Sequence, residues 1–172
     1  MSALQQVLDA LEEDEDGNAW SVAVPVPWMR KDCGFILEEY AADPAQADFG
    51  AAVAAFLRID QAVLDAAAAD VFAYYRRMHA LHEEHGMPSP RIDGPAQVWQ
   101  HVQFGFEAYA SRYHDGSVRI SLACNCDWEQ EHGLQLVFTQ DGRICKVGPF
   151  DGHLSHADAY GDPGLENVVY PH

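Results

Sequence analysis

The stretch from Ser117 to His153 constrains the fold most, because apolar and polar residues alternate along much of it between tight turns. Asp-Gly pairs at 115–116 and 141–142 are typical of short hairpin turns. The alternation predicts strands near residues 104–110, 118–124, 134–138 and 144–147. Strands joined by hairpins in sequence order form an antiparallel meander.

The N-terminal half adds a hairpin and two helices. Alternation over Trp20–Val26 and Gly34–Tyr40 predicts two paired strands, with Pro25 favouring an edge position. Apolar residues at helical spacing predict one helix after Asp43-Pro44 and a longer one from Asp60 to near Gly86. The expected class is α+β, with a single antiparallel sheet (N-terminal hairpin plus C-terminal meander) covered on one face by two central helices.

The length of 172 residues suits one domain, and the apolar fraction of 48% is enough for a packed core. We therefore predict a single α+β domain over 1–172. Residues 1–17 are expected to form a short helix capped by Ser2 and a solvated acidic loop. The tail over 154–172 is rich in Gly, Pro and Asp, and is expected to be irregular.

The charge is strongly acidic. The chain has 27 acidic and 10 basic side chains, for a net charge of −17, and residues 1–50 alone carry −9. Such a field repels phosphate backbones, so we expect no nucleic-acid partner. It attracts basic proteins, which makes a basic protein partner the favoured class. The oligomeric state stays open.

The termini and cysteines bear on the compartment. Cysteines at 33, 124, 126 and 145 do not make the dense framework of a small secreted scaffold. No basic segment opens the chain, and no apolar run approaches the roughly 20 residues that span a bilayer. These features predict a cytoplasmic protein with reduced thiols and no membrane contact.

One cluster could carry chemistry, and it allows two interpretations. In the structural one, the two cysteines are small buried hydrophobes, and the carboxylates and imidazole line a turn closed by a left-handed glycine. In the functional one, the acids and the imidazole form a metal or acid–base site. The Cys-x-Cys spacing does not match a zinc knuckle, and a thiol–imidazole pair is a further alternative. The motif comprises Cys124, Cys126, Asp127, Trp128, Glu129, Glu131, His132 and Gly133.

A second cluster, Asp151-Gly152-His153, reads by itself as a turn. If the meander brings it beside the first cluster, carboxylates and imidazoles from two loops could bind a divalent metal. The metal candidates are Glu129, Glu131, His132, Asp151 and His153. Apart from that alternative we expect no cofactor. No phosphate-binding loop, nucleophile elbow or dinucleotide fingerprint is present, so binding is favoured over catalysis and no catalytic residue is assigned.

The segment Trp128-Glu129-Gln130-Glu131-His132-Gly133-Leu134, followed by Val147-Gly148 and Asp151, resembles an uncharacterised family of bacterial domains of unknown function. Their signature is a Trp-acid-x-Glu-His-Gly-Leu turn. The resemblance covers residues 18 to 153 and implies no established activity. Similar small acidic domains occur as immunity proteins beside bacterial toxins, which suits the charge.

These observations lead to one expected function and one alternative. The expected function is a small acidic cytoplasmic binding protein, of the immunity type, that neutralises a basic toxin or another basic partner. The alternative is a metal-binding module or metal-dependent hydrolase that uses Glu129, Glu131 and His132 with Asp151 and His153.

Overall fold

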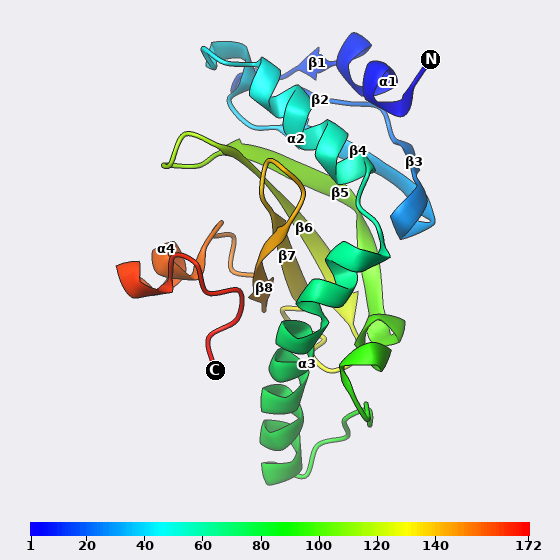
Figure 1. Ribbon diagram of the computed structural model, residues 1–172, viewed down its shortest axis with the longest axis vertical. Coiled ribbons are helices and arrows are strands. Elements are labelled where there is room, and N and C mark those ends of the chain that lie inside the picture. The colour runs from blue at the N-terminus through cyan, green and yellow to red at the C-terminus, as the bar shows by residue number, and fades with distance from the viewer. The chain divides into compact units, whose positions relative to one another are not determined.

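The structure is a computed structural model that describes all residues, 1–172, and it confirms the α+β class (Figure 1). Eight strands form a mostly antiparallel sheet in the order β1-β2-β4-β5-β6-β7-β8, with β3 paired to β4. The strands are β1 (Glu12–Glu13), β2 (Ala19–Trp20), β3 (Val24–Val26), β4 (Lys31–Leu37), β5 (Val102–Arg112), β6 (Val118–Cys126), β7 (Leu134–Phe138) and β8 (Ile144–Gly148).

The expected helices are present. Ser2 caps the first one by accepting a hydrogen bond from the amide of Gln5 at 3.1 Å. The α-helices are α1 (Ala3–Asp9), α2 (Ala47–Leu57), α3 (Gln61–Glu84) and α4 (His156–Tyr160). The 3-10 helices are η1 (Pro27–Met29), η2 (Tyr40–Ala42), η3 (Pro95–His101) and η4 (Pro163–Leu165). None of these helices combines the length and the apolar character that a membrane span requires.

The chain divides into two compact units. Unit 1 comprises residues 1–60, 105–122 and 138–143, and unit 2 comprises residues 61–104, 123–137 and 144–172. The strands β5, β6 and β7 therefore contribute residues to both units.

Unit 1 places α2 on one face of its strands. Phe56 of α2 packs edge-on against Phe35 of β4 and against Trp28, with ring centroids 5.5 and 5.2 Å apart. The indole of Trp28 also donates to the carbonyl of Phe56 at 2.8 Å. The contact between two buried rings and the half-buried Trp28 explains why this helix packs at this position.

One strand pair in unit 1 is parallel, whereas the sequence predicted an antiparallel sheet throughout. Residues of β4 pair with β5 in the register Gly34↔Glu107 to Leu37↔Ala110. Two sequential strands can lie parallel only when a long crossover joins them, and here the chain between them contains α2 and α3. The expected N-terminal hairpin pairing is present between β3 and β4, through Val24↔Cys33.

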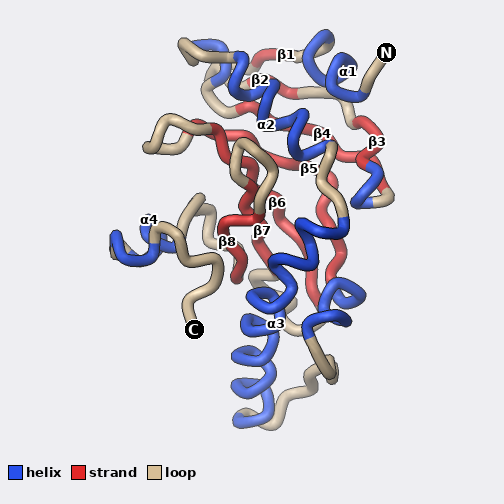
Figure 2. The backbone as a smooth tube through the Cα atoms, in the orientation of Figure 1, coloured by secondary structure: helices blue, strands red, loops and turns tan.

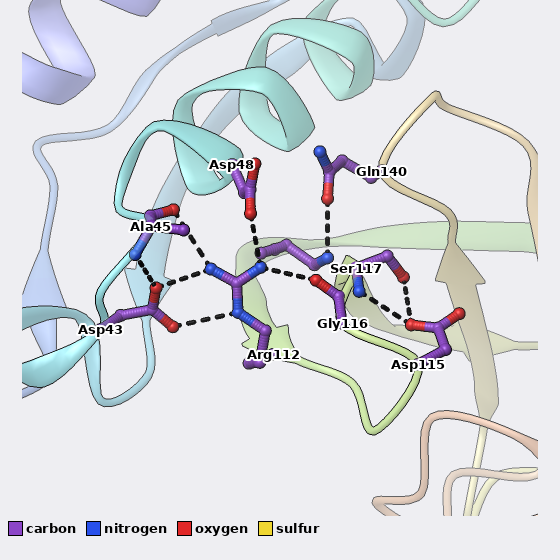
Figure 3. A network of polar contacts seen from close by, with 9 residues as sticks. Asp43, Ala45, Asp48, Arg112, Asp115, Gly116, Ser117 and Gln140 are labelled. Atoms are coloured by element: carbon purple, nitrogen blue, oxygen red, sulfur yellow. Dashed lines mark hydrogen bonds and ion pairs between the residues drawn. The ribbon is translucent and has the colours of Figure 1, made fainter.

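A single arginine organises the end of β5 in unit 1 (Figure 3). Arg112 donates two hydrogen bonds to Asp43, at 2.6 and 3.0 Å, and one to Asp48 at 2.6 Å. It also donates to the carbonyls of Ala45 and Gly116. The hydrogen bonds from Arg112 hold the pKa of the Asp43 carboxyl below its usual value, so this carboxylate stays ionised.

Unit 2 is built around α3. This helix packs against β8 and against η3, and the loop over residues 85–94 leads from the end of α3 to η3 (Figure 2). Gly86 ends the helix in the left-handed conformation, with φ of +65°. The indole of Trp99 in η3 donates to the carbonyl of Leu64 at 3.1 Å, which fixes η3 to the first turn of the helix.

The acidic segment before β2 is largely exposed, as its composition predicted, but it is not a loop throughout. Asp14 accepts hydrogen bonds from the amides of Asp16 and Asn18, both at 2.9 Å, and so closes a tight turn. Glu12 and Glu13 can then pair with β2 as the short strand β1. The strand β1 was not predicted, because the charge pattern does not show that the Asp14 carboxylate closes a turn.

Two further expectations need correction. The strand over Trp20–Val26 is interrupted, because the hydroxyl of Ser21 accepts the hydrogen bond of the Phe35 amide at 2.8 Å in place of a backbone carbonyl. The tail over 154–172 is not irregular throughout, since it contains α4 and η4. Ser155 caps α4 by accepting from the amide of Asp158 at 3.0 Å, a local motif that the Gly-Pro-Asp composition hid.

Candidate functional site

The turn after β6 is held by one carboxylate. Glu129 accepts hydrogen bonds from the amides of Glu131 at 2.9 Å and His132 at 2.6 Å. Its side chain is only 10% exposed, and the imidazole Nδ1 of His132 lies 3.2 Å from the same carboxylate. A buried carboxylate that satisfies two backbone donors shapes the turn, as an N-cap residue does at a helix start.

Gly133 is required at the end of this turn. Its φ is +63°, and a Cβ atom there would lie 2.3 Å from the carbonyl oxygen of Cys124. No side chain fits at that distance, and the left-handed conformation adds strain for any other residue. The backbone conformation of Gly133 and the lack of room for a Cβ atom both support a structural role for this residue.

Two tyrosines of α3 hold the turn from the helix side. The hydroxyl of Tyr74 donates to the carbonyl of Gly133 at 2.8 Å. Trp128 is 1% exposed and contacts Tyr74 and Tyr75 edge-on, with centroids 5.9 and 6.0 Å apart. The indole thus fixes the start of the turn to the helix, and the Tyr74 hydroxyl fixes its end.

Asp127 faces away from this packing. Its carboxylate lies 2.9 Å from Nδ1 of His101 and accepts from Nε2 of Gln103 at 3.2 Å, while its amide donates to the carbonyl of His101. These contacts tie the end of β6 to the end of η3 and the start of β5. Asp127 therefore connects the start of the turn to residues 101–103.

The two cysteines are buried on β6, as the structural interpretation expected. Cys124 is 6% and Cys126 is 4% exposed. Burial raises the pKa of the Cys126 thiol to about 12, so it stays neutral at physiological pH. Because a nucleophile must be a thiolate, the thiol–imidazole alternative has no support at this position.

The Asp151–His153 loop is organised by Lys146. This lysine is fully buried, and its ammonium donates to Asp151 at 2.5 Å, to Gln135 at 2.7 Å and to the carbonyl of His153 at 3.1 Å. Burial lowers the pKa of Lys146, while the carboxylate of Asp151 opposes that change. Asp151 also accepts from the amide of His153, which closes the turn.

The two loops meet through the backbone. The amide of Phe150 donates to the carbonyl of His132 at 3.2 Å. The ligand atoms of Glu129, Glu131 and His132 lie within 4.8 Å of one another. The carboxylate of Asp151 is engaged by Lys146 instead. Three of the five metal candidates thus form one group, and Asp151 belongs to a separate ion pair.

A cavity of about 580 Å³ opens beside the turn. Its walls come from α3 through Tyr74, Met78 and His82, and from the turn through Trp128 and Glu131. Two buried nitrogens of its lining residues, Nε1 of Trp128 and Nδ1 of His82, have no hydrogen-bond partner. The cavity combines apolar walls with polar groups, which is the usual make-up of a small-molecule pocket.

The histidines near the end of α3 do not form a metal set. Nδ1 of His79 lies 2.9 Å from the hydroxyl of Ser89, and Nε2 lies 3.5 Å from Glu83. His82 lines the cavity. His82 and His85 are three residues apart, whereas the zinc-protease motif needs histidines four apart.

Sequence reasoning missed two residues that shape the site, Tyr74 and Lys146. Nothing in the sequence around Tyr74 indicates that its hydroxyl reaches the carbonyl of residue 133. Lys146 lies in an apolar strand five residues before Asp151, and a lysine in such a strand indicates a buried partner. That signal could have identified the Lys146–Asp151 pair.

A family model described as a domain of unknown function (DUF6985) matches residues 7–154. The matched range includes the Trp128–Gly133 turn and the Asp151–His153 loop. No curated protein and no solved structure matches the chain.

Proposed function

The chain belongs to this family of domains of unknown function, DUF6985, and we propose that it acts as a small acidic binding protein for a basic protein partner. An immunity-type role, in which the partner is a toxin, is the specific form of the proposal. The observation that carries it is the negative charge of residues 1–50, which contain eleven acidic and two basic side chains. Ten of these eleven acids have accessible side chains, and the eleventh, Asp43, is 9% exposed in its pair with Arg112.

The placement of the cations supports the proposal. Arg112 is engaged by Asp43 and Asp48, and Lys146 is fully buried against Asp151. The guanidinium of Arg119 lies 3.6 Å from the ring of Tyr113, and its side chain is 9% exposed. These three of the ten basic residues are held in internal contacts, so they present little exposed positive charge to a basic partner, and the net charge that includes them is still −17.

Negative charge acts mainly on association rate and partner choice. Exposed carboxylates attract a basic protein over about a Debye length, near 10 Å at 0.1 M salt, and reject acidic competitors. An acidic inhibitor of a basic enzyme needs no catalytic residue of its own, which agrees with the structural role of Glu129 and Gly133.

The test is capture of the product of the adjacent gene by the purified protein. We expect a complex at about 0.15 M salt that associates more slowly, by about tenfold or more, at 1 M salt. A double variant, Glu15→Lys with Asp16→Lys, should slow association, because both side chains are exposed. Glu83→Lys with Glu84→Lys, at the end of α3, is the matched control for charge number. The proposal fails if no complex forms, or if salt leaves association unchanged.

A second candidate is a metal-binding module or metal-dependent hydrolase. The closeness of the carboxylates of Glu129 and Glu131 to the imidazole of His132 favours it. Glu129 already accepts two backbone hydrogen bonds, so a cation would share its oxygens with them.

Elemental analysis of the purified protein and the shift of its unfolding temperature with added zinc, manganese or calcium test this candidate. Glu131→Gln and His132→Gln should remove any metal-dependent stabilisation. A protein without bound metal whose unfolding temperature is the same with all three ions would exclude it.

A further inference from the structure

One face of the sheet in unit 1 is covered. The register places Ala19, Leu37 and Ala110 in one row across β2, β4 and β5, and all three are fully buried. Phe35 belongs to the same face by strand alternation, and its ring packs on Phe56 of α2. This is the side of the sheet that α2 occupies.

The neighbouring row lies on the opposite face. Glu12, Trp20, Ile36 and Tyr109 are paired in register across β1, β2, β4 and β5. Trp20 is 41% and Tyr109 is 38% exposed, and Ile36 between them is buried. Two accessible aromatic rings therefore flank an apolar centre on the face that α2 leaves open. We call these four residues the Trp20–Tyr109 surface.

Carboxylates surround this surface. Glu107 precedes Tyr109 by two residues on β5, and so shares its face. Glu38 accepts a hydrogen bond from the hydroxyl of Ser111 on the same strand. Partial burial raises the pKa of Tyr109, and the negative charges of Glu107 and Glu38 raise it further.

The ring of Trp20 is fixed before any partner arrives. Its Nε1 donates to Asp14 at 3.0 Å, and Asp14 is itself held by Asn18. The hydrogen bonds from Trp20 and Asn18 lower the pKa of Asp14 to about 2, so this carboxylate remains charged. A ring held in place loses little conformational freedom on binding.

From this arrangement we propose that the Trp20–Tyr109 surface is a docking site for an arginine-bearing segment of a basic partner protein. A guanidinium stacks on an aromatic face and can donate two parallel hydrogen bonds to a neighbouring carboxylate. Exposed aromatic rings with carboxylates of the same sheet face nearby offer both contacts at once. The inference rests on the proposed function, since it names the surface that the basic partner contacts and the residue type that it presents.

The test uses fluorescence anisotropy of a labelled peptide of alternating arginine and glycine. We expect Trp20→Ala and Tyr109→Ala each to weaken binding about fivefold, the loss of one cation–π contact. Trp20→Phe keeps a ring but not the indole N–H, and should weaken binding less than Trp20→Ala does. Glu107→Gln should weaken binding and reduce its salt dependence.

Controls come from the same strand and from the peptide. Phe106 is 68% exposed, and strand alternation places it on the face opposite Tyr109, so Phe106→Ala should leave affinity unchanged. A lysine–glycine peptide should bind more weakly than the arginine peptide, because an ammonium group has no planar face to stack on a ring and cannot form a bidentate pair with a carboxylate. A glutamate–glycine peptide should not bind.

The outcomes separate this inference from the proposed function. If the arginine peptide binds equally well to wild type, Trp20→Ala and Tyr109→Ala, the surface is wrong and the proposed function stands. If the adjacent gene product binds but the arginine peptide does not, the arginine chemistry is wrong and the proposed function again stands. If neither binds, both are overturned. Concentration-dependent sedimentation that Trp20→Ala abolishes would assign the surface to a second copy of the chain and overturn the inference.

Discussion

The hydroxyl of Tyr74 reaches from α3 to the carbonyl of Gly133 and donates a 2.8 Å hydrogen bond to it. Both residues are buried, so this carbonyl has no ready substitute in water. Tyr74→Phe should therefore lower the free energy of unfolding by about 1–2 kcal/mol, the cost of leaving a buried acceptor unpaired. Urea denaturation measures it, and Tyr160→Phe, at a residue 62% exposed, should change stability little. An unchanged midpoint in Tyr74→Phe would show that the contact contributes nothing.

Gly133 and Gly86 form a matched pair, because their φ angles are +63° and +65°. Around Gly86 nothing lies within 4 Å of an added Cβ, whereas at Gly133 the carbonyl of Cys124 lies 2.3 Å away. We expect Gly86→Ala to cost about 1 kcal/mol, the strain of a left-handed residue. Gly133→Ala should cost about 3 kcal/mol or more, or prevent folding. Equal costs in the two variants would contradict the steric role assigned to Gly133.

Removal of the counter-charge of Lys146 should be costly, because the ammonium is fully buried. We expect Asp151→Ala to lower stability by about 2 kcal/mol at pH 7, below the cost for a fully buried pair, since Asp151 is 34% exposed. Without the carboxylate the pKa of Lys146 should fall further, so the variant should recover stability as pH rises toward 10. Asp93→Ala breaks the exposed Arg91–Asp93 pair and should cost under about 1 kcal/mol. A loss in Asp151→Ala that persists unchanged at alkaline pH would argue against a charge effect.

The thiols should differ in reactivity. Burial raises the pKa values of Cys33 and Cys126 to about 12, and Cys124 is also buried. Cys145 is the least buried of the four, so we expect it to react first with iodoacetamide at pH 8. Mass spectrometry of the alkylated native protein gives the order in which the four cysteines react. Labelling in urea gives the reaction rate of each cysteine when it is fully accessible. Early modification of Cys126 in the native protein would contradict the buried placement.

His156 should make the protein sensitive to acid. Its Nε2 lies 2.9 Å from the carbonyl of Val147 and 3.0 Å from that of Val169, so this nitrogen carries the proton. Burial lowers the pKa of His156 below 6.5, and the charge of Lys146 contributes to the same direction. The unfolded chain then binds a proton more readily than the native one, so the stability from this site is present above pH 6.5 and is lost as pH falls below it. His156→Gln should flatten the slope of stability against pH over that interval.

The sequence predicted the elements that have a strong period. Alternation around Asp115-Gly116 and Asp141-Gly142 located β6, β7 and β8, and apolar spacing located α2 and α3. These predictions succeed because an element that buries one face must repeat its apolar residues with the period of a strand or a helix. Elements set by a single polar side chain were missed. β1 depends on the Asp14 turn, and α4 depends on the cap from Ser155.

The site was predicted in part for the same reason. The burial of Cys124 and Cys126 and the left-handed conformation of Gly133 follow from local pattern. The contacts of Asp127 with His101 and of Asp151 with Lys146 join residues from different elements. No spacing rule relates such residues, because the tertiary fold brings them together. The Trp20–Tyr109 surface likewise depends on the register of four strands, which the sequence alone does not give.

The strand β1 has a bearing on how the protein behaves at high concentration. It stands at one end of the sheet order, is two residues long, and both of its residues are exposed glutamates. A second molecule that tried to extend the sheet there would find few backbone groups and two like charges facing its own. This border of the sheet is therefore a poor template for aggregation.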